Sequence, residues 1–146
     1  MGKQSATEIL KQYAQRTTDK RVALLELLMD SPRAFALSDI EKQLSIPMDR
    51  VTIYRTLHSY EENGLVIKMV DQKGVGLYMF NHKEHSNIST HPHLRCKECE
   101  TVICLPCLPD EYLEELKKYE IDEMYFLMEG KCHKCSAKQA DTKSQG

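Results

Sequence analysis

The first half of the chain has helical periodicity, with apolar residues three or four positions apart and polar residues between them. Residues 20–30 form the densest such stretch. The segment 48–63 repeats the pattern, with Ile53, Leu57 and Tyr60 on one face. A face of this kind has to be buried against other elements, so both segments are predicted to be amphipathic helices.

Local signals mark where these helices begin and end. Asp19 and Ser38 are of the residue types that cap helix N-termini, and Gly64 stands where a C-cap glycine is expected. We therefore expect helices at residues 5–15, 20–30 and 48–63, and a short one after Ser38 that contains Ile40 and Leu44.

Strand patterns follow the fourth helix. The segments LVIKMV (65–70) and VGLYMF (75–80) are rich in β-formers and flank a loop that contains Gly74. A short helix, a turn, a long helix and then a β-hairpin is the layout of a winged helix-turn-helix.

The pattern changes after Phe80. Residues 81–93 are polar and hold four of the six histidines, so we interpret this segment as a linker. Short strands are predicted at 93–96, 101–105 and 121–130, with a helix from 110 to about 119. We expect a winged-helix domain at 1–80, a linker at 81–92, a small α/β domain at 93–136 and a flexible, frayed tail at 137–146.

Two Cys-x-x-Cys pairs lie in the second half, Cys96/Cys99 and Cys132/Cys135. Each pair can grip a metal ion from a tight turn, and four thiolates complete the tetrahedral shell that structural zinc prefers. Each half of this 146-residue chain has a thin core, which a metal would reinforce. We predict a structural Zn²⁺ that is closed to substrates.

A second, exchangeable metal site is predicted just before the first pair. His91 and His93 stand two apart, so on a strand both imidazoles point to one side. The alternative is a polar linker that is rich in histidine by accident. Further candidate ligands are His82, Glu84, His85, Cys104 and Glu111. Cys104 and Cys107 form a third pair, whose role the sequence leaves open among a metal pair, a reversible disulfide and buried filler.

The predicted helix 48–63 has a candidate nucleic-acid face. Residues 1–80 carry 11 Lys and Arg against 10 Asp and Glu, so the chain is no bulk polycation and any DNA contact must be focused. Early residues of the second helix of a helix-turn-helix meet base edges and phosphates. The alternative is a solvated helix surface on a protein-interaction module. The predicted DNA contacts are Arg16, Lys20, Arg21, Arg50, Thr52, Tyr54 and Arg55.

Other classes of protein are disfavoured. The chain has no apolar run of membrane-spanning length and no secretory signal, so we expect a cytoplasmic protein without a membrane partner. It also lacks a thioredoxin-like context and an HExxH motif, so we expect no thiol oxidoreductase or zinc hydrolase.

Taken together, these motifs resemble the ferric uptake regulator family of metal-responsive repressors. The resemblance covers about residues 8–135. It is carried by TTDKRVALLELL (17–28), VTIYRTLHSYEENGLV (51–66), HPHLRCKECETV (91–102) and GKCHKC (130–135).

The resemblance implies an α+β protein in which the C-terminal domain dimerises and two winged helices bind a palindromic operator. It assigns Cys96, Cys99, Cys132 and Cys135 to structural zinc. It also assigns His91 and His93 to the sensing site, Tyr54 and Arg55 to the recognition helix, and Arg16 to a position near the minor groove.

Several positions depart from the family pattern. Met79 replaces a usual glutamate, and Ala34-Phe35 stand where a histidine often does. Thr90, Pro92 and Met124 replace ligands of a third family site, although Glu111 remains. We infer a sensing site rebuilt from linker residues, with Zn²⁺ favoured and Fe²⁺ or Mn²⁺ as alternatives. The rival hypothesis is a peroxide- or redox-sensing regulator of the same fold.

Overall fold

The computed structural model describes residues 4–81, 92–122 and 124–143. Four helices open the chain: α1 (Ala6–Gln12), α2 (Asp19–Met29), α3 (Leu37–Gln43) and α4 (Arg50–Glu62). The hairpin β1 (Val66–Val70) and β2 (Gly76–Phe80) follows. After it come β3 (His93–Cys96), β4 (Val102–Cys104), α5 (Asp110–Leu116), β5 (Leu127–Gly130) and α6 (His133–Lys143).

Side-chain caps set the helix starts, and two of the predicted caps are wrong. The cap of α2 is Thr18 rather than Asp19, because the Thr18 hydroxyl accepts the backbone N–H of Arg21 at 3.3 Å. At α3 the chain turns at Ala36 rather than Ser38, because the Asp39 carboxylate accepts the Ala36 N–H at 3.2 Å. The sequence predicted both helices correctly and placed their caps one or two residues late.

Helix α4 has its C-cap one residue before the predicted cap at Gly64. Asn63 is its C-cap, and Gly64 has a φ of +77°, in the left-handed region that glycine adopts without strain. The N–H of Leu65 then returns to the carbonyl of Tyr60 at 2.9 Å, which turns the chain directly into β1.

The helices and one face of the hairpin enclose the main core. Leucines of α2 meet the buried face of α4, and the hairpin adds Val66 and Tyr78. Phe35 bridges Tyr78 through two backbone hydrogen bonds of 2.8 Å, which adds a third short segment to the hairpin. The buried residues of this core are Ala6, Ile9, Leu10, Leu24, Leu25, Leu28, Phe35, Ile40, Ile53, Leu57, Tyr60, Leu65, Val66 and Tyr78.

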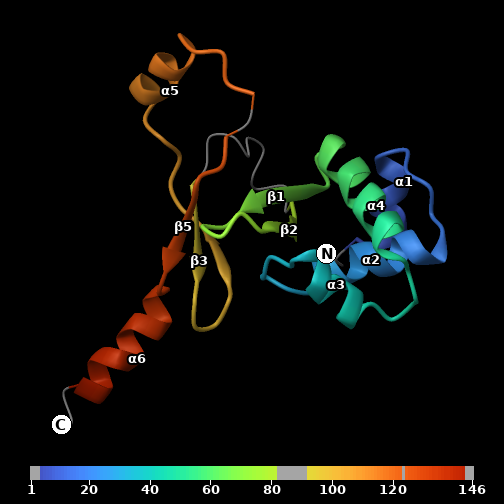
Figure 1. Cartoon of the computed structure of the whole chain (residues 1–146), viewed down its shortest axis with the longest axis horizontal. Helices are drawn as coiled ribbons and strands as arrows, with labels where there is room; N and C mark the ends of the chain where they lie inside the picture. Colours follow the sequence, from blue (N-terminus) through green and yellow to red (C-terminus); the bar gives the residue numbers. More distant parts are fainter. Residues whose placement is uncertain (1–3, 82–91, 123, 144–146) are drawn as a thin grey trace.

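The other face of the hairpin packs against the C-terminal sheet, so β1 and β2 lie between the helices and strands β3–β5 (Figure 1). Its alternate residues join Val102 of β4 in a second cluster, here called the boundary cluster: Ala34, Ile67, Met69, Leu77, Met79 and Val102. The Val102 N–H also donates to the carbonyl of Pro32 at 3.1 Å. Successive side chains of a strand point to opposite faces, so the predicted hairpin contributes to two cores, one on each face.

The C-terminal sheet has the order β4-β3-β5. β3 pairs antiparallel with β4 and parallel with β5. Among the described residues of the predicted strand 121–130, the strand covers Leu127–Gly130, which pair with the four residues of β3.

Residues 137–143 of the expected tail belong to α6. The segment contains alanine, lysine and glutamine, which favour helix, and no Gly or Pro. Figure 1 shows α6 extending away from the rest of the chain.

Candidate metal centre and nucleic-acid interface

Cys96 and Cys99 stand at the turn that follows β3. Glu100 closes this turn with a φ of +63°, and its N–H donates to the carbonyl of Cys96 at 2.9 Å. The backbone N–H of Cys99 points at Cys96 Sγ, 3.5 Å away. A sulfur that accepts a backbone N–H is stabilised as a thiolate, the form that binds metal.

Cys132 and Cys135 form a matching turn at the start of α6. The N–H of Cys135 lies 3.5 Å from Cys132 Sγ, as in the first turn. Parallel pairing of β3 with β5 sets Cys96 opposite Gly130, and the Lys97 N–H donates to the Gly130 carbonyl at 2.8 Å. This register delivers the second pair of thiols to the first.

The four sulfurs are mutually close enough to share one ion. All lie within 4.8 Å of one another, and Cys99 Sγ is 3.8 Å from Cys132 Sγ. A tetrahedral zinc with Zn–S bonds of about 2.3 Å separates its sulfurs by about 3.8 Å. Cys96, Cys132 and Cys135 are buried and Cys99 is half-buried. The donor set and spacing fit structural Zn²⁺, which four thiolates would enclose without an open position.

The thiols differ in how readily they ionise. Backbone hydrogen bonds, first from Cys99 and then from Cys132, lower the pKa of Cys96 to about 6. Hydrogen bonds from the side chain and backbone of Thr101 lower the pKa of Cys99. The neighbouring sulfurs, Cys132 first, raise the pKa of Cys135 to about 12. Crowded thiols resist losing all their protons together, so a closed four-thiolate site needs the charge of a divalent cation.

The structure brings together two of the predicted sensing residues. His93 and Cys104 are directly paired across β3 and β4, which puts their side chains on one face of the sheet. The His93 side chain is buried, and burial raises the pKa of the half-buried Cys104.

Of the other sensing candidates, only Glu111 belongs to the part of the chain that the structure describes. Glu111 is exposed on α5. His82, Glu84, His85 and His91 lie outside the described residues. Within 4–81, 92–122 and 124–143, the four-cysteine cluster is the one group of three or more His, Cys, Asp or Glu that could share an ion.

Four of the described residues that depart from the family pattern have structural roles. Met79 and Ala34 are buried in the boundary cluster, where a carboxylate or an imidazole would have to enter an apolar environment. Phe35 belongs to the main core, and the carbonyl of Pro92 accepts the Leu105 N–H at 2.9 Å. The side chains of Met79, Ala34 and Phe35 therefore pack in apolar clusters.

The predicted DNA contacts fall into two groups. Tyr54 and Arg55 are exposed on α4, and Arg16 and Lys20 are exposed near α2. Tyr54 stacks on His58, with ring centroids 6.4 Å apart and the planes inclined by 8°. These side chains are available to a ligand.

The remaining three predicted contacts are engaged within the protein. The Thr52 hydroxyl and backbone N–H both donate to the Asp49 carboxylate, which caps α4. Arg50 pairs with Glu41 at 2.9 Å. Arg21 donates to Gln15 at 2.9 Å and lies over the Tyr60 ring. Thr52 and Arg21 therefore help to build the helices.

A recess that the sequence did not predict lies between the start of α4 and the hairpin. Its volume is 340 Å³. Lys68 and Tyr78 of the hairpin line it opposite Arg50 and Tyr54 of α4. The one lysine in the otherwise apolar strand pattern LVIKMV was the available signal.

Comparison with known proteins identifies the family. The model of the ferric uptake regulator family matches residues 12–118. The ferric uptake regulation protein of Bacillus subtilis (strain 168) is 30% identical over 142 residues, covering 90% of this chain and 93% of the relative. The peroxide operon regulator of the same organism is 27% identical, covering 92% and 93%.

The fold agrees with these matches. A solved zinc uptake regulator, complexed with zinc and DNA, superposes with a TM-score of 0.67 at 22% identity, over 92% of this chain and 93% of that one. The chain belongs to the ferric uptake regulator family and is a metal-dependent transcriptional regulator that binds DNA.

Proposed function

We propose that the chain is a homodimeric repressor that senses a second divalent ion, zinc in preference to iron(II) or manganese(II), through His93, Cys104 and residues of the 81–92 linker. The observation that carries the proposal is the direct pairing of His93 with Cys104. An imidazole and a thiolate together favour zinc over iron(II) or manganese(II). His91, His82, Glu84 and His85 are the linker candidates for the remaining ligands.

The location of this pair supports a switch. Cys104 is two residues from Val102, which packs in the boundary cluster against the hairpin. The linker that supplies the other candidates joins the same hairpin to β3. Ligands drawn from the linker and the sheet would hold the winged helix at one angle to the C-terminal domain. An ion shifts this arrangement only as far as it binds one orientation more tightly than others.

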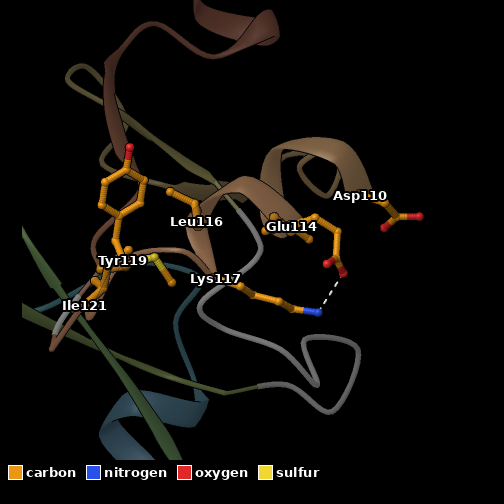
Figure 2. Close-up of a pocket in the computed structure, with 8 residues that line it drawn as sticks. Asp110, Glu114, Leu116, Lys117, Tyr119 and Ile121 are labelled. Carbon is orange, nitrogen blue, oxygen red and sulfur yellow. Dashed lines mark hydrogen bonds and ion pairs between the residues drawn. The ribbon is translucent and has the colours of Figure 1, made fainter.

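The homodimer has a suitable surface on the C-terminal half. Helix α5 contributes no buried residue, and β5 is an edge strand whose outer side is unpaired within the described sheet. Tyr112, Tyr119, Ile121, Tyr125 and Met128 are large side chains exposed around it. Figure 2 shows Tyr119 and Ile121 beside Leu116 at a recess of 540 Å³. Exposed apolar surface of this kind is typical of an interface, here with a second copy.

Within the described residues, no helix has the length and apolar character needed to cross a bilayer. We place the regulator in the cytoplasm, with double-stranded operator DNA as its partner, and assign it no catalytic role. The closed four-cysteine shell supports that assignment because it leaves no coordination position for a substrate.

The test is a metal titration of chelated protein with zinc, iron(II) and manganese(II) separately, without oxygen. Binding to a duplex selected from random sequence is followed by fluorescence anisotropy, and bound metal is counted by mass spectrometry. We expect one retained and one exchangeable ion per chain, with zinc giving the tightest DNA complex. Cys104→Ser and His93→Ala should lose the exchangeable ion, and Cys107→Ser, at an exposed thiol, should keep it.

DNA binding that is independent of every metal would contradict the sensing function. Binding that requires iron(II) or manganese(II), and is lost on adding peroxide, would instead support the redox-sensing alternative.

A further inference from the structure

The recess between α4 and the hairpin contains two cationic side chains and two tyrosines. Arg50 and Tyr54 come from the exposed side of α4, and Lys68 and Tyr78 come from neighbouring strands. Tyr54 is 48% exposed, so the recess is continuous with the outer surface of the candidate recognition helix. The other lining residues are Ala36, Leu37, Ser38, Val70, Gly74, Val75 and Gly76, and none of the lining residues is acidic.

The ammonium of Lys68 is held in place by the hairpin itself. Lys68 pairs with Tyr78 across the strands, and its Nζ lies 6.0 Å from the centroid of the Tyr78 ring. The stem of the lysine crosses Gly76, where an added Cβ would come within 3.3 Å of Lys68 Cε. The small residue leaves room for the stem, and the ring attracts the cation. The position of the charge is therefore set before a ligand arrives.

The charge of Lys68 is available to a ligand. Among the ion pairs between described residues, none involves Lys68, whereas Arg50 is paired with Glu41. The buried ring and hydroxyl of Tyr78 lie beside the ammonium of Lys68, which forms none of these ion pairs. Such an environment suits an oxyanion.

We propose that this recess receives one backbone phosphate of each operator half-site, with Lys68 as its direct contact. The inference deepens the DNA-binding function and rests on it. When the exposed side of α4 enters a major groove, the phosphates that line the groove pass beside the helix, and the hairpin is the element next to α4 there. Lys68 positions the helix without reading a base, because it lies on the strand and contacts the sugar–phosphate chain.

The experiment compares Lys68→Gln with Lys138→Gln in full-length, metal-loaded protein. Lys138 is exposed on α6, remote from the recess, and its loss removes the same charge. Affinity for the selected operator duplex and for an unrelated duplex is measured by anisotropy at several salt concentrations. Zinc content and thermal unfolding report whether each variant is folded.

Lys68→Gln should weaken binding to both duplexes by the same factor, about tenfold for two lost surface ion contacts per dimer. The slope of log affinity against log salt should fall by about 1.8, which is 0.9 for each of two phosphates. Lys138→Gln should match the wild type. Lys68→Arg, which keeps the charge, should restore the slope.

Two results would overturn the assignment. A wild-type slope and affinity in Lys68→Gln would show that Lys68 makes no phosphate contact. A loss confined to the operator would show that it reads a base. If the wild type binds no duplex with any metal, the regulator function fails as well, whereas normal metal-dependent binding by Lys68→Gln overturns only this inference.

Gly76→Ala tests the placement of the stem separately. The variant keeps every charge but puts a Cβ 3.3 Å from Lys68 Cε, so the lysine stem has to shift slightly. We expect a loss of about two- to threefold in affinity, as for a weak surface contact, at an unchanged salt slope. Wild-type affinity in Gly76→Ala would overturn the role of Gly76 in placing the lysine.

Discussion

The two halves of the chain are stabilised in different ways. The winged helix buries a continuous set of leucines, isoleucines and aromatic rings from α1 to β2. The C-terminal half has a buried cluster made of Cys96, Cys132 and Cys135, with Cys99 and Ile103 packed against it. The apolar core of the winged helix forms from the chain alone, because burial of its side chains is itself favourable. Burial of the cysteine cluster is stabilised by the metal that the thiolates bind. The winged helix is thus stable by itself, whereas the C-terminal half depends on its metal.

The largest effect that tests this contrast is expected from Cys96→Ser. Loss of one thiolate should abolish zinc retention, because binding to a four-sulfur site contributes about 10–16 kcal/mol to folding. Zinc content should fall from one ion per chain to none, and the strand signal of the C-terminal half should disappear in NMR spectra. The helices of the first half should persist.

The matched control is Cys107→Ser, which removes an exposed thiol outside the cluster and should retain zinc. Concerted loss of both halves in Cys96→Ser would contradict the division.

Leu25→Ala is the converse change. Leu25 is fully buried in the main core, and truncation of a core leucine costs about 2–5 kcal/mol. Chemical denaturation should show the winged helix destabilised by that amount while the zinc content stays at one. Val51→Ala, at a site 55% exposed, is the control and should change stability by less than about 0.5 kcal/mol. Zinc loss in Leu25→Ala would show that the C-terminal half depends on the winged helix for its stability.

Tyr60→Phe examines a buried hydrogen bond that joins α4 to α2. The buried Tyr60 hydroxyl donates to the carbonyl of Arg21 at 2.8 Å. Leaving that carbonyl without its donor should cost about 1–3 kcal/mol in denaturant unfolding. Tyr112→Phe, at an exposed ring, should cost nothing measurable.

The same tyrosine predicts an alkaline pH dependence. Burial raises the pKa of Tyr60 well above the ordinary value of 10.0. The unfolded chain therefore ionises first, and the stability due to the neutral phenol is present below pH 10 and lost as pH rises above it. Tyr60→Phe lacks this loss, so the stability gap between the two proteins should narrow above pH 10. A constant gap would contradict the assignment.

The smallest expected effect concerns a helix cap. Thr18→Ala removes the acceptor for the Arg21 N–H and should destabilise α2, and with it the winged helix, by about 1 kcal/mol. Thr17→Ala, one residue outside the cap, should have a smaller effect on the denaturation midpoint. Equal effects of the two variants would indicate that Thr18 does not act as the cap.

Much of the fold was readable from local patterns. Helical spacing predicted α2 and α4, strand-forming residues on both sides of a loop with Gly74 predicted β1 and β2, and the Cys-x-x-Cys spacing predicted both turns of the metal centre. The cap at Thr18 was missed because its neighbours Thr17 and Asp19 are also residue types that cap helices. The cap position at Ala36 was missed because an alanine side chain has no group that accepts a hydrogen bond. The helix at 133–143 was missed because a polar segment without an apolar face resembles a tail.

The role of Lys68 was hidden for a different reason. In the sequence it interrupts an apolar strand, and only the pairing with Tyr78 and the passage over Gly76 show where its charge is held. The roles of Met79 and Ala34 were hidden in the same way. Both are apolar because they pack with Val102, a residue distant in the chain.

By itself, the sequence determined the chemistry of the protein: four thiols in two turns, histidines before the first turn, and a helix followed by a hairpin. These depend on residue type and short spacing. The tertiary structure decided which groups meet. Parallel pairing of β3 and β5 joins the two cysteine pairs, and pairing of β3 and β4 joins His93 to Cys104. The hairpin lies between two cores and connects the winged helix to the C-terminal half. Contacts between distant segments follow from register and packing, which local spacing does not encode.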